Sequence, residues 1–336
     1  MLKDVLQDYY FEQNYNCAES LLRAANDYYQ LGITEHDLIL MAGFGGGIQT
    51  GSVCGAVLAA VSVLSCRCVE AKAHESRTIK PMVMNFLERF QNKLQAGTLC
   101  RDIRPRYFRE NGRCIATVCA ACDALEETFR EPVVSVETMR QSDAWTIAQK
   151  VPSKELMSRA GKAIFESADW KGPVAVICGK GNNAGDGYVA AALMKEQGID
   201  CTVILVSEQF SEDGKYFYDR CLEKGVRTEQ YREDMDFKAY RTILDCLLGT
   251  GFQGEVRGNM KTVIEKINQS GAFVVSADIN SGLNGDTGEG TTYVRSDLTV
   301  SIGAFKYGHF LGQAAEAMKE KVNRDIGIRV FSETVR

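Results

Sequence analysis

The sequence has no excess of positive charge. Its 39 lysines and arginines are outnumbered by 44 aspartates and glutamates, which gives a formal net charge of −5. A nucleic-acid or anionic-membrane surface is therefore not expected, because such surfaces need clustered basic residues. An uninterrupted run of 18 apolar residues and a basic, apolar leader are also lacking, so neither a membrane span nor a signal peptide is predicted. We expect a cytoplasmic protein that acts on small molecules.

Internal repeats, low-complexity tracts and long charged tails are absent as well. At 336 residues the chain exceeds the size at which one hydrophobic core usually stops growing, so two domains are expected. Helix-period apolar positions and few prolines predict an all-α, cysteine-rich domain over residues 1–131. Over residues 132–336, apolar strands alternate with amphipathic helices, which predicts a Rossmann-like α/β domain with a doubly wound parallel sheet.

Cysteine is abundant and unevenly distributed. Eight of the twelve cysteines fall within the first 122 residues. Because a reducing compartment disfavours structural disulfides, this concentration favours metal, cluster or thiol redox chemistry. For any single cysteine the alternative is a small, buried core residue. That alternative is the prediction for the four dispersed cysteines of the second domain, Cys178, Cys201, Cys221 and Cys246.

Cys114, Cys119 and Cys122 have the spacing of a plant-type [2Fe–2S] loop. Such a loop needs irregular backbone, whereas "CIATVCAAC" is apolar and predicts a helix, so an iron–sulfur cluster is the less favoured interpretation. Cys119 and Cys122 also form a C-x-x-C pair, which on a helix would share a face and could act as a redox dithiol.

Polar, glycine-rich loops follow the predicted strands of the second domain. The loop "GKGNNAGDG" formally fits the G-x-G-x-x-A fingerprint of dinucleotide binding, so a nicotinamide dehydrogenase is one alternative. Asp186 argues against it, because a carboxylate beside a pyrophosphate would be repelled or protonated. Asparagine and aspartate suit a ligand rich in hydroxyls and amides, or a hard cation. Since carboxyl ends of parallel strands meet at one edge, these loops are expected to form one site.

Five ordered segments resemble the YjeF N-terminal domain, the NAD(P)HX epimerase family, over about residues 133 to 330. They are "SKELMSRAG", "VICGKGNNAGDGYVAA", "LDCLLGTGFQGEVRG", "SADINSGLNGDTG" and "DLTVSIGAFKYGH". The resemblance implies an isomerase that interconverts the S and R forms of hydrated NAD(P)H in metabolite repair. It also implies a separate ADP- or ATP-dependent dehydratase in the same pathway, and it is compatible with a homodimer.

The same resemblance implies the residues of the site. A potassium ion would be held by Asn183, Asp245 and Ser281. The substrate contacts would be Asn182, Asn183, Ala184, Gly185, Asp186, Gly249, Thr250, Gly251, Phe252, Gln253, Gly254, Glu255 and Asp278.

The chemistry favours proton transfer at this site. The carbon to be inverted carries a hydroxyl and adjoins the ring nitrogen, so it can invert by ring opening or by losing and regaining water. Asp278 is the predicted general acid and base, and Lys306 would protonate or orient the departing oxygen. A solvated surface cation is an equal alternative for Lys306.

Two residues depart from the family pattern, with Ala184 in place of glycine and Asn280 in place of proline. A strained or loosened loop would leave a binding module without catalysis, which is the alternative function.

The first domain is similar to the redox-protein family named for its C_GCAxxG_C_C pattern, over about residues 5 to 128. The segments are "NCAESLL", "GFGGGIQTGSVCGAVLAA", "GTLCRDI" and "RCIATVCAA". The resemblance aligns Cys17, Cys54, Cys100 and Cys114 as candidate redox or metal-binding thiols, with an iron–sulfur cluster or another metal as the candidate cofactor. A thiol or electron-transfer protein whose second domain senses a nucleotide is a further alternative.

Overall fold

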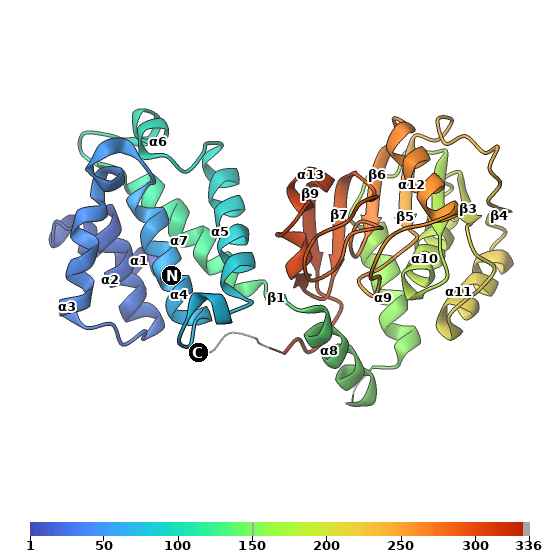
Figure 1. The fold of residues 1–336 in the computed structure, drawn as a ribbon, viewed down its shortest axis with the longest axis horizontal. Helices are drawn as coiled ribbons and strands as arrows, with labels where there is room; N and C mark the ends of the chain where they lie inside the picture. The colour runs from blue at the N-terminus through green and yellow to red at the C-terminus, as the bar shows by residue number, and fades with distance from the viewer. Residues whose placement is uncertain (150, 332–336) are drawn as a thin grey trace. The chain divides into compact units, whose positions relative to one another are not determined.

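The computed structural model describes residues 1–149 and 151–331. They form two compact units that divide between Pro132 and Val133 (Figure 1). The sequence analysis places its boundary one residue earlier. No described helix is long and apolar enough to cross a membrane.

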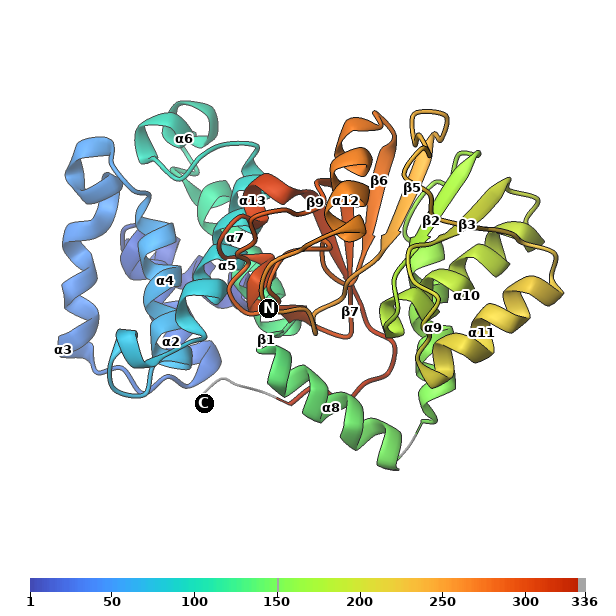
Figure 2. The same cartoon turned by 45° about the vertical axis from the view of Figure 1, so that its right-hand side comes forward.

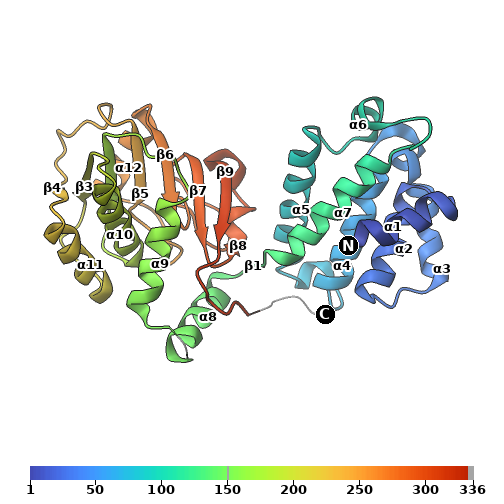
Figure 3. The same cartoon turned by 180° about the vertical axis from the view of Figure 1, so that it is seen from behind.

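The first unit is helical, as predicted. Its helices bury one apolar face each, and Leu21, Phe86 and Leu125 are fully enclosed in the core. Figure 3 shows α5 and α7 side by side in this unit. The helices are α1 (Leu2–Gln7), α2 (Cys17–Tyr29), α3 (Glu35–Leu38), α4 (Gly55–Cys68), α5 (Ile79–Leu94), α6 (Cys100–Tyr107) and α7 (Ile115–Arg130).

The second unit is built on a parallel sheet, as predicted. Within the described residues the sheet has seven strands in the order β4-β3-β2-β5-β6-β7-β9. Its strands are β2 (Val174–Cys178), β3 (Cys201–Leu205), β4 (Arg227–Gln230), β5 (Thr242–Cys246), β6 (Phe273–Ala277), β7 (Ser296–Ile302) and β9 (Met318–Arg324).

Both faces of the sheet are covered. Along β2, Val174 and Val176 pack into the core on one face, and Ala175 and Ile177 pack into the core on the other. A strand buried on both sides needs a continuous apolar run, which is what "VAVIC" supplies. Figure 2 shows α9, α10 and α11 together beside the sheet. The helices are α9 (Ser153–Phe165), α10 (Asn182–Glu196), α11 (Glu212–Glu223), α12 (Asn259–Gln269) and α13 (Ala314–Ala317).

A short parallel pair fixes the start of the second unit. β1 (Val133–Val134) pairs with β8 (Phe305–Lys306), and α8 (Val136–Gln149) follows directly. In Figure 2, α8 lies beyond the lower edge of the sheet. The segment that follows β9 secures this helix, because Arg329 N donates to Thr146 Oγ1 at 3.0 Å and Phe331 N donates to Ser142 Oγ at 3.0 Å.

The sequence analysis did not predict β4 and β9. Both are edge strands with polar sequences, "RTEQ" and "MKEKVNR", so they lack the apolar run that marks the inner strands. The prediction for the dispersed cysteines is confirmed, because Cys178, Cys201, Cys221 and Cys246 are all buried in the α/β unit.

Candidate functional site

A cavity of about 670 Å³ lies at the carboxyl edge of the sheet. The loops that follow β2, β5, β6 and β7 all contribute to its wall, together with α8 and α9. The order of strands reverses between β2 and β5. From β2 the chain proceeds to β3 on one side of the sheet, and from β5 it proceeds to β6 on the other side. Doubly wound sheets bind ligands at this kind of reversal.

The loop after β2 is shaped by close contact with the loop after β5. A Cβ atom on Gly179 would lie 2.0 Å from the carbonyl oxygen of Leu247, so only glycine fits there. Helix α10 then begins at Asn182, and Ala184 stands in its first turn. Ala184 does not have a positive φ, so alanine at this position causes no backbone strain.

Asp278 stands directly after β6 and has the left-handed φ of +62°. This conformation is uncommon for a residue other than glycine, asparagine or aspartate, and such backbone is concentrated at functional sites. Asp278 Oδ1 accepts hydrogen bonds from Lys306 Nζ and, at 3.2 Å, from Ile302 N. The carboxylate lines the cavity.

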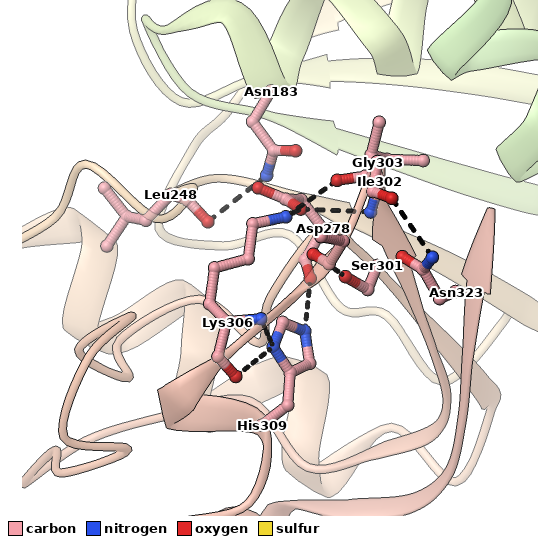
Figure 4. Close-up of polar contacts among 10 residues, drawn as sticks. Asn183, Leu248, Asp278, Ser301, Ile302, Gly303, Lys306, His309 and Asn323 are labelled. Carbon is pink, nitrogen blue, oxygen red and sulfur yellow. Dashed lines mark hydrogen bonds and ion pairs between the residues drawn. The ribbon is translucent and has the colours of Figure 1, made fainter. Parts of the chain in front are cut away.

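Lys306 is buried, with 1% of its side chain exposed. Its ammonium forms an ion pair with Asp278 and donates to the carbonyl oxygen of Ile302 at 2.9 Å (Figure 4). The surface alternative for this lysine is therefore wrong. A buried ammonium next to a carboxylate in a cavity wall is well placed for proton transfer.

His309 connects the backbones of the two residues (Figure 4). Its Nδ1 accepts a hydrogen bond from Lys306 N at 3.0 Å, so Nε2 carries the proton and donates to the carbonyl oxygen of Asp278 at 2.8 Å. Burial, with the charge of Lys306 second, lowers the pKa of His309 to about 4, and the ring is neutral at physiological pH. The sequence analysis did not assign His309 a role, although its motif "AFKYGH" contains it.

Two further carboxyl groups line the same cavity, those of Asp143 and Asp186. Burial raises the pKa of Asp143 to about 6, and the charge of Lys306 opposes that rise. Burial also raises the pKa of Asp186 well above its usual value, and the charges of Asp278 and Asp143 add to the effect. The sequence analysis missed Asp143, because a single aspartate in an amphipathic helix has no local signal.

Two of the three residues predicted to bind potassium, Asn183 and Ser281, meet at the carbonyl oxygen of Leu248, and the third, Asp245, contacts Ser281. Asn183 Nδ2 donates to this oxygen at 3.2 Å, and Ser281 Oγ donates to it at 3.1 Å. Ser281 Oγ also lies 2.5 Å from Asp245 Oδ1. Asn183 Oδ1 is buried without a hydrogen-bond partner in the described structure. An unsatisfied buried oxygen, on an amide that contacts the carbonyl group also contacted by Ser281, fits a cation that prefers oxygen ligands.

The carboxyl group of Asp245 is fully enclosed. Burial raises its pKa, against hydrogen bonds from Ser281, Leu247 and Ser276 that favour the ionised form. The bonds from Ser276 Oγ and Ser281 N to Oδ2 measure 2.9 and 3.0 Å. Asp245 therefore ties the ends of β5 and β6 together.

A proline at position 280 would make the loop rigid through its ring. Asn280 instead holds the loop through the hydrogen bonds of its side chain. Its Nδ2 lies within 2.8 to 3.0 Å of the oxygens of Val294, Ser296 and Ala317. Its Oδ1 accepts from Thr299 Oγ1 at 2.6 Å. The side chain is fully buried, and its hydrogen bonds fix the loop that carries Asp278 to the neighbouring segments.

The structure divides the predicted substrate contacts into two groups. Four lie outside the cavity wall: Ala184 and Gly185 are buried in α10, Gly254 follows the lining part of its loop, and exposed Glu255 pairs with Arg257. The others line the cavity, namely Asn182, Asn183, Asp186, Gly249, Thr250, Gly251, Phe252, Gln253 and Asp278.

In the helical unit, the four aligned cysteines share one structural position, the N-terminus of a helix. Cys17 and Cys100 are the first residues of α2 and α6, and Cys54 and Cys114 are the N-caps of α4 and α7. A helix N-terminus carries partial positive charge, which favours a thiolate.

Short contacts bring three of these helix ends together, those of Cys17, Cys54 and Cys100. Cys54 N donates to the carbonyl oxygen of Thr98 at 2.8 Å, and Cys100 N donates to that of Ser52 at 2.7 Å. A Cβ on Gly55 would lie 2.8 Å from Cys17 Sγ, and one on Gly47 would lie 2.6 Å from Cys100 Cβ. Gly47 and Gly55 therefore permit this close approach, because a larger residue at either position would clash.

The four thiols influence one another electrostatically. Burial raises the pKa of Cys54 to about 12, and the charge of Cys17 is the second cause. Burial and then Cys17 likewise raise the pKa of Cys100 and of Cys114. Free thiols at Cys54, Cys100 and Cys114 are thus protonated at neutral pH, unless a partner compensates their charge.

The iron–sulfur interpretation gains no geometric support. Cys119 and Cys122 lie within the regular helix α7, not in an irregular loop. Across residues 1–149 and 151–331, no group of three or more histidines, cysteines, aspartates or glutamates is arranged to hold a metal ion.

Comparison with known proteins agrees with both units. The family described as "YjeF-related protein N-terminus" matches residues 153–308, and "Putative redox-active protein (C_GCAxxG_C_C)" matches residues 15–128. The NAD(P)H-hydrate epimerase of Lentilactobacillus buchneri is 32% identical over 202 residues, which cover 58% of this chain and 94% of that protein. The chain belongs to the NAD(P)H-hydrate epimerase family.

Two other relatives show how much of a longer family member the chain covers. The NAD(P)H-hydrate epimerase of Rhodopirellula baltica is 30% identical over 55% of this chain and 80% of its own length. The bifunctional NAD(P)H-hydrate repair enzyme Nnr of Coxiella burnetii is 34% identical over 56% of this chain. The match spans 40% of that bifunctional relative. Family membership favours an isomerase over the dehydrogenase alternative.

Proposed function

We propose that the α/β unit interconverts the S and R forms of hydrated NAD(P)H. The observation that carries this proposal is the buried Asp278–Lys306 ion pair in the wall of the switch-point cavity. Inversion at a carbon that bears a hydroxyl and adjoins a ring nitrogen moves protons and no electrons. Asp278 accepts and returns the proton, and Lys306 donates to the departing oxygen. His309 keeps both groups in place through their backbones.

A coupled assay tests this function. A separate ADP- or ATP-dependent dehydratase, which we propose as the partner in the pathway, is chosen to accept one epimer only. Given a mixture of both epimers, the dehydratase by itself should consume only the epimer that it accepts. Once this chain is added, the dehydratase should consume the whole mixture. Continued survival of the other epimer would contradict the proposal. A homodimer stays a prediction.

We further propose that potassium binds at Asn183, Asp245 and Ser281, with the carbonyl oxygen of Leu248 beside them. The unsatisfied Asn183 Oδ1 supports this site. When bound, the ion supplies positive charge next to the buried carboxylate of Asp245. It would hold together the loops that follow β2, β5 and β6.

Potassium is expected to raise the melting temperature of the α/β unit. An ion that binds the folded state alone stabilises it by mass action, by about 2.7 kcal/mol at 100 times its Kd. The measurement is thermal unfolding in potassium chloride and in N-methyl-D-glucamine chloride of equal ionic strength. Asn183→Ala should abolish the difference, and Asn268→Ala, at an exposed site, should preserve it. Identical wild-type melting curves in the two salts would count against the site.

For the helical unit we propose thiol redox chemistry at Cys17, Cys54, Cys100 and Cys114. The observation in its favour is that four helix N-termini each place one of these cysteines within electrostatic reach of others in the set. The alternative is that the cysteines only fill space between helices.

Diamide is expected to oxidise two thiols of this set to a disulfide, with two electrons passing to diamide, which becomes the hydrazine. Peptide mapping by mass spectrometry should find the bond within the set. Cys17→Ser should change its pattern, whereas Cys201→Ser, in the core of the α/β unit, should not. If oxidant produces no bond among the four and elemental analysis finds no metal, the redox proposal for this unit is wrong.

A further inference from the structure

Helix α8 contributes a carboxylate to the cavity that the mechanism above does not use. Met139, Arg140, Asp143 and Ile147 recur at helical spacing and line the cavity, so one face of α8 forms part of its wall. Bonds from Arg329 and Phe331 hold the helix in place. Asp143 is therefore presented to the ligand from a fixed element.

The carboxylate of Asp143 is half-buried and forms no hydrogen bond or ion pair within the described parts of the chain. Lys306 uses its ammonium on Asp278 and Ile302 instead. Asp143 nevertheless interacts electrostatically with both Lys306 and Asp278. The cavity thus has the Asp278–Lys306 pair on the sheet side and an unpaired carboxyl group on the helix side.

An epimerase needs chemistry on both sides of the ring. The hydroxyl lies on one side in the S form and on the other side in the R form. When water is lost, the C–O bond breaks, the oxygen takes up one proton, and the nitrogen lone pair forms a C=N bond. When water adds from the opposite side, a C–O bond forms, the electron pair returns to nitrogen, and the added water releases one proton. Protons and electrons balance without an oxidant.

We propose that Asp143 is the second acid–base group of this site, which exchanges a proton with the oxygen on the side of the hydrated ring facing α8. The Asp278–Lys306 pair serves the side that faces the sheet. The inference rests on the proposed epimerase function and identifies a catalytic residue for it. In the S-to-R and R-to-S directions, the two groups exchange the roles of proton donor and proton acceptor.

The protonation of Asp143 fits this role. Burial raises its pKa to about 6, so the group is protonated below that pH and ionised above it. The charged groups that line the cavity with it are Arg140, Lys180, Asp186, Asp213, Asp278 and Lys306. Lys306 stabilises the ionised form of Asp143, and Asp278 opposes it.

The test uses the full chain and purified epimers. Asp143→Asn should lower kcat/KM about 100-fold, and the inflection near pH 6 in the wild-type pH profile should disappear. Asp143→Ala should be equally slow, and added formate should restore part of its rate by entering the vacated space. Glu137→Gln, on the exposed part of α8, should stay within twofold of wild type. Unfolding curves of each variant verify that it is folded.

Two results would overturn the role of Asp143 alone. One is an Asp143→Ala variant as fast as an active wild type. The other is a slow Asp143→Ala variant that formate does not rescue, together with an inflection near pH 6 that persists in Asp143→Asn. An inactive wild-type chain would instead overturn the epimerase function, and this inference with it.

Discussion

Asp278→Asn is expected to slow epimerisation about 10³-fold without unfolding the protein, because general acid–base groups contribute about 10²- to 10⁴-fold. Asparagine keeps an oxygen that can accept from Lys306 and Ile302, and it tolerates the left-handed φ of +62°. What it removes is the ability to accept and return a proton. The measurement is the initial rate of epimer conversion, followed by chromatography.

The matched control is Asp234→Asn. Asp234 is an exposed aspartate that forms a surface pair with Arg232 at 3.3 Å and does not line the cavity. Its amide variant should convert the epimers at the wild-type rate. A folded Asp278→Asn variant within threefold of wild type would remove Asp278 from the mechanism.

Asn280→Ala is expected to lower the free energy of unfolding of the α/β unit by about 3 kcal/mol or more. Truncation removes the amide donor from the buried carbonyl oxygens of Val294 and Ala317 and the acceptor of the Thr299 hydroxyl, and it removes packing at a fully enclosed position. Both tryptophans, Trp145 and Trp170, belong to this unit, so tryptophan fluorescence in a denaturant titration reports on it alone.

The control is Asn268→Ala. Asn268 also bonds two backbone groups, the carbonyl oxygen of Tyr293 and the N–H of Arg295, but it is exposed. Water can replace its bonds, so the loss should stay below about 1 kcal/mol. Equal effects of the two variants would show that burial of the Asn280 network adds nothing to stability.

The inner strands and the edge of the sheet that carries the site could be predicted from the sequence, because their signals are local. Continuous apolar runs mark β2 and β5, and the polar loop after each strand points to the same edge. Asp278 and Lys306 could be chosen from these loops. The conformation of Ala184 could not be predicted from the sequence, because it depends on the residue at which α10 begins.

Features that depend on tertiary contacts could not be predicted from the sequence. Nothing in "AFKYGH" shows that His309 bonds the backbones of both Asp278 and Lys306. Asp143 precedes the loops of the site by more than thirty residues, and only the packing of α8 brings it to the cavity. The burial of Lys306 likewise could not be predicted, because a single charged residue in a two-residue strand carries no sequence signal of burial.

The central claim is that the cavity at the end of this sheet inverts the hydrated carbon of the nicotinamide ring. The most direct measurement starts from each pure epimer of hydrated NADH and follows both by chromatography with the wild-type chain, with Asp278→Asn and without protein. We predict that the wild-type chain reaches the same S-to-R ratio from either side, far sooner than the other two samples. Interconversion no faster with the wild-type chain than without protein would contradict the claim.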